Sequence, residues 1–294
     1  MSAEAVVGHE APANMSEYFE HHLTNLPFSL KDWSIVPHKQ EKLLDFSLIN
    51  LDTVVFSVLM GVIGLLILWL VARKVTSGVP SRTQAAVEAL IEMVESQSKA
   101  IVHGDRTFVA PLALTVFFWV AFMNAMDWIP IDLPGALIGA LHLNIPYSRI
   151  VATADINATM GMAFAVFLLM IYYSLKIKGF GGFGHELISA PFGSHPALIL
   201  PNLLINCVEY FSKTVSLGVR LFGNMFAGEL LFALIATMGA AWGTATLGTG
   251  LALAAGQVVA GSIWAIFHIL VVLLQAFIFM MLTLVYVGQA HESH

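Results

Sequence analysis

Five long apolar segments dominate the pattern of hydrophobic and polar residues along the chain. Each of the first three is close to the ~20 residues with which an α-helix crosses the core of a bilayer, and charged residues or a proline follow it. These three segments cover residues 53–72, 108–129 and 156–175. The pattern predicts three ordinary membrane-spanning helices, and the glycines at 181, 182 and 184 predict a loop after the third.

The last two apolar segments, residues 197–238 and 251–287, are about twice as long as a bilayer requires. At 1.5 Å per residue, a helix over the first of them is ~60 Å long. Either the chain turns back within the segment or the helix is tilted or bent. Because no turn signal follows Pro201, we expect two long, strongly tilted helices, with the turn between them in residues 243–250.

Composition also indicates a membrane protein. Of the 294 residues, 58% are hydrophobic and only 11% are charged, whereas soluble domains average roughly 25% charged residues. The net charge of −6 argues against a nucleic-acid partner, and the single cysteine, Cys207, excludes an intramolecular disulfide and a multi-thiolate metal cluster. We expect an all-α polytopic membrane protein without metal or cofactor. A polar tail over residues 1–46 precedes a single membrane domain over residues 47–294.

The lysine and arginine residues between the apolar segments predict the orientation of the chain in the membrane. Residues 73–106 carry five of them, the loop after the second segment carries only Arg149, and Lys176 and Lys178 follow the third segment. We therefore expect the first and third loops in the cytoplasm, the N-terminus outside and the C-terminus inside. The tail lacks the basic start and apolar core of a signal peptide.

The first cytoplasmic loop carries a pattern of its own. Apolar residues recur at helical spacing between Ala85 and Val94, while Glu88, Glu92 and Glu95 occupy other positions. This amphipathic pattern predicts a helix that lies in the membrane interface.

Ionisable side chains inside an apolar segment are unfavourable in lipid, so each of them is a candidate functional residue. In this sequence they concentrate in the last two segments, and two neutral polar residues accompany them. They are Glu209, Lys213, Arg220, Glu229 and His268, with Asn224 and Gln275. Glu209 and Lys213 are four residues apart, and mutual neutralisation is the simpler interpretation of that pair.

Arg220 lies near the middle of its segment, with apolar neighbours and no acidic residue within four positions. A guanidinium cannot escape the membrane by losing its proton, as an amine can. The side chain either reaches the interface or a distant carboxylate, or it supplies a fixed positive charge beside an ion pathway. We favour the ion pathway.

Glu229 and His268 form a second candidate site. Glu229 lies nine residues after Arg220, on the opposite side of the helix, and antiparallel packing of the last two segments would bring it near His268. The two side chains would then exchange protons, whereas a hydrogen-bonded core histidine is the alternative role for His268. Gln275 shares a helix face with His268. Four residues around the outer loop either line a channel mouth or pair in the loop: Asp127, Asp132, Arg149 and Asp155.

The residues around Arg220 resemble a family signature. Residues 215–230 read VSLGVRLFGNMFAGEL and are similar to the signature of the a subunit of bacterial F-type ATP synthases. Residues 264–270, WAIFHIL, followed by LQAF at 274–277, resemble the last helix of the same family. With shorter likenesses, the resemblance covers roughly residues 45–287.

The resemblance implies a stator channel subunit in the bacterial inner membrane, with no nucleotide site of its own. Its partner is a rotating ring of small hairpin subunits, each with a membrane-buried carboxylate. In the family, the arginine that matches Arg220 faces the ring, and residues that match Glu229, His268 and Gln275 line the outer half-channel. Asn224 is expected on the same proton pathway.

The resemblance also implies a route and partners. A proton enters from the outer side, neutralises a ring carboxylate and leaves after nearly a full turn of the ring. The candidates for channel entry or exit are Asp127, Asp132, Asp155, Glu209 and Ser216. Where several relatives carry a second carboxylate, this sequence has Asn206, and Glu209 is the nearest acid. The expected partners are the ring (subunit c), the peripheral stalk subunit b, the rest of the complex and membrane lipid.

A stand-alone secondary transporter is the alternative function. In that hypothesis Arg220 binds an anionic substrate. The sequence shows no internal repeat and no matched pair of Gly/Pro-broken segments, which are typical of such carriers.

Overall fold

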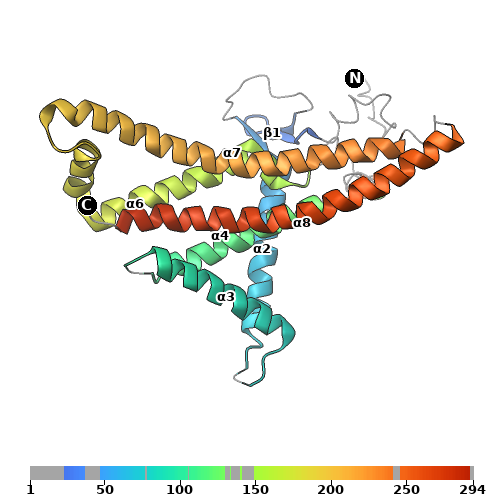
Figure 1. Cartoon of the computed structure of the whole chain (residues 1–294), viewed down its shortest axis with the longest axis horizontal. Helices are drawn as coiled ribbons and strands as arrows, with labels where there is room; N and C mark the ends of the chain where they lie inside the picture. The colour runs from blue at the N-terminus through green and yellow to red at the C-terminus, as the bar shows by residue number, and fades with distance from the viewer. Residues whose placement is uncertain are drawn as a thin grey trace. The chain divides into compact units, whose positions relative to one another are not determined.

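The structure, a computed structural model, describes residues 23–36, 47–76, 78–104, 106–129, 149–240 and 246–291, together with Leu133 and Ala140. In this part of the chain five helices are long and apolar enough to cross a membrane. They are α2 (Leu51–Ala72), α4 (Val109–Ala125), α6 (Ile156–Ser189), α7 (Ile199–Ala240) and α8 (Leu247–His291) (Figure 1). This confirms the prediction of an all-α polytopic membrane protein.

The last two helices are at least as long as the apolar pattern predicts. α7 has 42 residues and α8 has 45. Because α7 is a single helix, the chain does not turn back within it. α8 begins at Leu247, four residues before the expected start, so the second part of the expected turn is helical. The first part of that turn, residues 243–245, lies outside the described residues.

α6 differs from the prediction after Lys178. The helix continues to Ser189 with a break at Gly179 (φ 70°, ψ 170°), a conformation that favours glycine, so the expected loop at residues 181–184 is wrong. The side chain of Lys178 reaches past the break, and its Nζ lies 2.7 Å from Oε2 of Glu186. This ion pair, buried for most of the area of both side chains, stabilises the helical second part.

The expected interfacial helix is α3 (Arg82–Ile101). Ser81 caps its N-terminus by accepting a hydrogen bond from the backbone N–H of Gln84 at 3.2 Å. On its exposed face, Nζ of Lys99 lies 2.6 Å from Oε1 of Glu95. The hydrogen bond and the charge of Lys99 hold the pKa of Glu95 below its ordinary value.

The chain divides into two compact units. The first comprises residues 1–60, 123–155 and 224–272, and the second comprises residues 61–122, 156–223 and 273–294. Each is described by itself below.

The first unit contains a small antiparallel sheet that the sequence did not predict. Its strands are β1 (Pro27–Ser29), β2 (Ser34–Ile35) and β3 (Leu48–Asn50), with β1 in the centre. Two of these strands fall within the segment that we expected to be a polar tail. Each strand has only two or three residues, too few to show the alternation of a longer strand.

Two buried carboxylates join the sheet to the start of α2. Asp52 accepts hydrogen bonds from the backbone N–H groups of Leu26 (2.9 Å) and Thr53 (2.8 Å). Asp155 accepts from the side chains of Asn50 (2.7 Å) and Thr53 (2.9 Å). Asp155 is more than 100 positions away in the sequence from both of these partners.

In the second unit, α6 and α7 pack antiparallel. A Cβ atom at Gly218 would lie 2.6 Å from Sδ of Met160, so the glycine permits this close approach. Near the other end of the contact, Asn206 donates hydrogen bonds to the carbonyl groups of Leu187 and Ala190, both at 2.9 Å. Helix packing thus accounts for a glycine and for the amide at position 206.

Candidate functional site

A buried ion pair joins Arg149 to Glu229 in the first unit. Nε of Arg149 donates hydrogen bonds to both carboxylate oxygens of Glu229, at 3.0 and 3.2 Å, and its Nη2 donates to Oε2. Each side chain is only 6% exposed. A buried charge needs a partner, so removal of either residue would leave the other uncompensated.

Arg149 also contacts the segment before the sheet. Its Nη1 donates to the carbonyl oxygen of Leu23 at 3.3 Å and to Oδ1 of Asn25 at 3.4 Å. The guanidinium carbon lies 5.6 Å from the centre of the Phe226 ring on α7. A single side chain therefore connects Glu229 to residues 23–25.

His268 on α8 forms a second buried pair. Its Nε2 lies 2.7 Å from Oδ2 of Asp127, although the two groups are not aligned as a hydrogen bond. The imidazole is completely buried, and the ring centres of Phe232 and Trp264 lie 5.3 and 5.7 Å from its own. Asp127 itself belongs to η1 (Met126–Trp128), the short turn that follows α4.

The direct proton exchange expected between Glu229 and His268 stays a prediction, and the structure gives each of these side chains another ionic partner. Antiparallel packing does bring α7 against His268, but the residue that meets the imidazole is Gly228, while Glu229 faces Arg149. The charge pattern of the sequence predicts for Arg149 a place among the charged residues around the outer loop, but not its pairing with Glu229. The available signal was that Arg149 is the only lysine or arginine between Arg106 and Lys176.

The substitution Gly228→Ala is expected to lower the stability of the chain. The added methyl group would lie 2.9 Å from Oδ2 of Asp127 and 3.0 Å from Nδ1 of His268, and such overpacking typically costs about 1–3 kcal/mol. Thermal unfolding of the detergent-solubilised chain measures the loss. Gly223→Ala is the matched control, because an added Cβ there meets nothing within 4 Å. An equal loss in both variants would contradict this explanation.

Arg220 belongs to the second unit and is exposed. Its Nη2 donates a hydrogen bond to the hydroxyl of Ser216 at 3.2 Å. Among the described residues, no carboxylate forms an ion pair with it. Within the described part of the chain, the polar contact of this guanidinium is thus with a neutral hydroxyl.

Exposed residues next to Arg220 on α7 form a stripe. Small and apolar side chains recur on it at intervals of three and four residues. Its members in the second unit are Ser216, Val219, Arg220 and Gly223. This stripe places one fixed positive charge among residues that allow close approach of another surface.

Glu209 and Lys213 form the ion pair that their spacing predicts, with Nζ 2.6 Å from Oε1. Lys213 also donates a hydrogen bond to Gln289 on α8 at 2.8 Å. Both charged residues, with Asn206 and Tyr210, line a cavity of about 270 Å³ in the second unit. The amide of Asn206 donates to two carbonyl groups near the end of α6. Glu209 is the carboxylate that α7 contributes to the lining of this cavity.

The remaining candidates are distributed over both units. Asn224 is exposed on α7 in the first unit, and Gln275 is buried on α8 in the second. Asp155 serves the packing of α2, and Asp132 lies outside the described residues. Among the residues that the structure describes, no three His, Cys, Asp or Glu side chains are arranged to hold a metal ion.

Comparison with known proteins matches nearly the whole chain. Residues 54–288 match the family model described as ATP synthase A chain. The chain is 54% identical to ATP synthase subunit a of Acidovorax sp. (strain JS42) over 95% of this chain and 96% of that protein. It is 52% identical to ATP synthase subunit a of Paracidovorax citrulli (strain AAC00-1), with both chains fully covered. A relative in Photobacterium profundum, ATP synthase subunit a 1, is 47% identical over 95% of this chain and 96% of that protein.

Proposed function

Because the chain belongs to the ATP synthase A chain family, we propose that it is the stator channel subunit that drives the rotation of a carboxylate-bearing ring. Membership of the family makes it a proton-translocating membrane component of the complex and not a catalytic subunit. It acts together with other subunits, and its five membrane helices and bacterial relatives indicate the bacterial inner membrane. The half-channels, the ring and the role of the arginine are the proposal.

The observation that carries the proposal is the environment of Arg220. It lies on an exposed stripe within a membrane-spanning helix and contacts a hydroxyl instead of a carboxylate of its own chain. An ionised ring carboxylate that passes this stripe gains a fixed positive partner. Since a guanidinium keeps its proton at physiological pH, Arg220 attracts the carboxylate without carrying protons between the half-channels.

In this proposal the outer half-channel passes the two buried pairs, Arg149 with Glu229 and Asp127 with His268. Asp127 and Asp132 receive the proton, which passes Glu229, His268 and Gln275 and then neutralises the ring carboxylate. A neutral carboxyl group can face lipid, whereas an ionised one there is strongly unfavourable. Asn224 is a polar residue on the side of α7 that faces the ring. Oδ2 of Asp127 lies 2.7 Å from Nε2 of His268, so two groups of the proposed route are immediate neighbours.

Arg149 adds a positioning role to this route. Its hydrogen bonds hold both oxygens of Glu229 and favour the ionised carboxylate. A proton that arrives at Glu229 therefore competes with Arg149, which helps return the group to its ionised state after each transfer.

The inner half-channel leads past Ser216 towards the cavity that Glu209 lines. Ser216 lies next to Arg220, and Glu209 lies about two helical turns before Ser216. In this proposal Glu209 supplies the exit carboxylate, because the amide of Asn206 is engaged in helix packing. A proton released from the ring leaves towards the cytoplasm by this route.

The proposed partners are the ring of subunit c, the peripheral stalk subunit b and the surrounding lipid. With the N-terminus outside and five spans, α8 ends in the cytoplasm. Asp127, at the end of α4, then lies near the outer surface, and the α6–α7 connection lies near the inner surface. This orientation agrees with the proposed order of entry and exit.

Reconstitution separates this function from the alternative of a stand-alone transporter. The purified chain alone in proteoliposomes is expected to show neither proton flux nor anion uptake. The complete complex in the same vesicles is expected to acidify them when ATP is added, as a pH-sensitive dye reports. Substrate transport by the chain alone would overturn the proposal in favour of the carrier hypothesis.

A further inference from the structure

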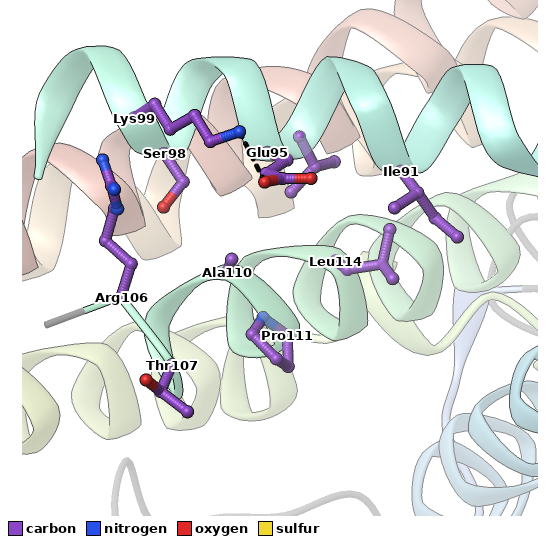
Figure 2. Close-up of a pocket in the computed structure, with 10 residues that line it drawn as sticks. Ile91, Glu95, Ser98, Lys99, Arg106, Thr107, Ala110, Pro111 and Leu114 are labelled. Atoms are coloured by element: carbon purple, nitrogen blue, oxygen red, sulfur yellow. Dashed lines mark ion pairs between the residues drawn. The ribbon is translucent and has the colours of Figure 1, made fainter.

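A cavity of about 370 Å³ lies in the second unit between α3 and the beginning of α4, and none of the candidate site residues lines it (Figure 2). Its volume falls in the range of ~300–1,000 Å³ that is usual for small-molecule sites. Figure 2 shows polar side chains, including Ser98 and Arg106, at one end and the apolar Ile91 and Leu114 at the other. The cavity is therefore amphiphilic.

The hydroxyl of Ser98 is the clearest sign of a ligand. Ser98 is completely buried and lines the cavity, and its Oγ has no hydrogen-bond partner within the described part of the chain. In Figure 2 its side chain points from α3 towards α4. A buried polar group without a partner typically costs about 1–3 kcal/mol, so an acceptor at this position would be stabilising.

The charges at the same end favour an anion. Lys99 and Glu95 neutralise each other through their 2.6 Å contact. Arg106 forms no ion pair with any residue that the structure describes, and the lining as a whole carries one net positive charge from Lys99, Arg106 and Glu95. An anion between Ser98 and Arg106 would satisfy both the hydroxyl and the guanidinium.

The depth of the two ends matches a phospholipid. The membrane span of α4 begins at Val109, so Arg106 precedes it, whereas Leu114 lies ~7.5 Å further along the helix. The cationic end therefore lies at the level of lipid headgroups, and the end with Ile91, Pro111 and Leu114 lies at the level of acyl chains. Inorganic phosphate shares the anionic chemistry but would leave this apolar end without a partner.

We propose that the cavity between α3 and α4 binds one anionic phospholipid. Its phosphate accepts hydrogen bonds from Arg106 and from the hydroxyl of Ser98. An acyl chain lies along Ile91, Pro111 and Leu114. The site is independent of the proposed proton route and fastens the interfacial helix to the start of α4.

Native mass spectrometry of the full-length chain in detergent tests the site. With phosphatidylglycerol added, a one-lipid complex is expected to persist under conditions that remove phosphatidylcholine. Arg106→Gln is expected to weaken the retention of phosphatidylglycerol about five-fold, the scale of one basic residue at an anionic surface. Ser98→Ala should also weaken it without lowering the thermal stability of the lipid-free chain, because it removes a hydroxyl that lacks a partner.

Arg82→Gln is the matched control, since Arg82 is an exposed arginine on α3, the helix that carries Ser98, but does not line the cavity. It is expected to retain phosphatidylglycerol as the unmodified chain does. Equal retention of the two lipids, or an equal loss in Arg82→Gln, would overturn the proposal. Displacement of the lipid by an equal concentration of inorganic phosphate would also overturn it, in favour of a free-anion site.

Discussion

Replacement of Arg220 by alanine is expected to abolish ATP-driven proton pumping and leave a passive proton leak. Without the guanidinium, the ionised ring carboxylate has no fixed partner, and nothing separates the two half-channels electrostatically. Loss of one partner from a charge pair at low dielectric typically costs about 3–5 kcal/mol, so coupled pumping should fall at least ~100-fold. Inverted membrane vesicles that contain the assembled complex, with a pH-sensitive dye, measure both pumping and leak.

Arg73→Ala is a matched control for this experiment. Arg73 follows the end of α2, and its guanidinium carbon lies 4.7 Å from the centre of the Trp69 ring, remote in sequence from the candidate site. The control should pump as the unmodified complex does. If the Arg220→Ala complex assembles in normal amounts and still pumps at a normal rate, Arg220 does not have the proposed role.

Glu229→Gln is expected to have the second-largest effect, because it removes a proton carrier and leaves Arg149 buried without a counter-charge. We expect proton translocation to fall at least ~10-fold, on the scale of a lost acid–base group. We also expect the chain to lose about 3–5 kcal/mol of stability, the usual effect of breaking a buried ion pair. Vesicle acidification and thermal unfolding of the solubilised chain measure the two effects separately.

The double variant Glu229→Gln with Arg149→Met distinguishes the two contributions. Removal of both charges eliminates the uncompensated guanidinium, so much of the stability should return while translocation stays low. Glu88→Gln serves as the control, because Glu88 lies on α3 outside the membrane spans and accepts a hydrogen bond from Gln84. Recovery of translocation in the double variant would show that Glu229 matters for structure alone.

The helices were predictable because the hydrophobic and polar pattern within each segment is sufficient to indicate a helix. α7 needed only an uninterrupted apolar segment longer than a bilayer, and α3 needed only an amphipathic repeat. The continuation of α6 beyond Gly179 was not predictable, because it depends on one backbone conformation and on the pairing of Lys178 with Glu186.

The long-range contacts of the candidate site could not be predicted from the sequence. Arg149 and Glu229 are 80 residues apart, and nothing local to either one selects the other. Helical periodicity placed α7 opposite His268, but a difference of one residue decides whether Gly228 or Glu229 meets the imidazole. The small sheet escaped detection for a related reason, since its short strands are held by hydrogen bonds between distant residues.

The guanidinium of Arg149 binds Glu229 and residues 23–25 at the same time, and this shared contact creates a thermodynamic linkage. Such linkage is reciprocal. If ionisation of Glu229 changes the equilibrium constant for docking of residues 23–25 by some factor, docking of these residues changes the proton affinity of Glu229 by the same factor. A ligand or antibody that withdraws Leu23 and Asn25 from Arg149 would therefore alter proton uptake at a carboxylate that it never touches.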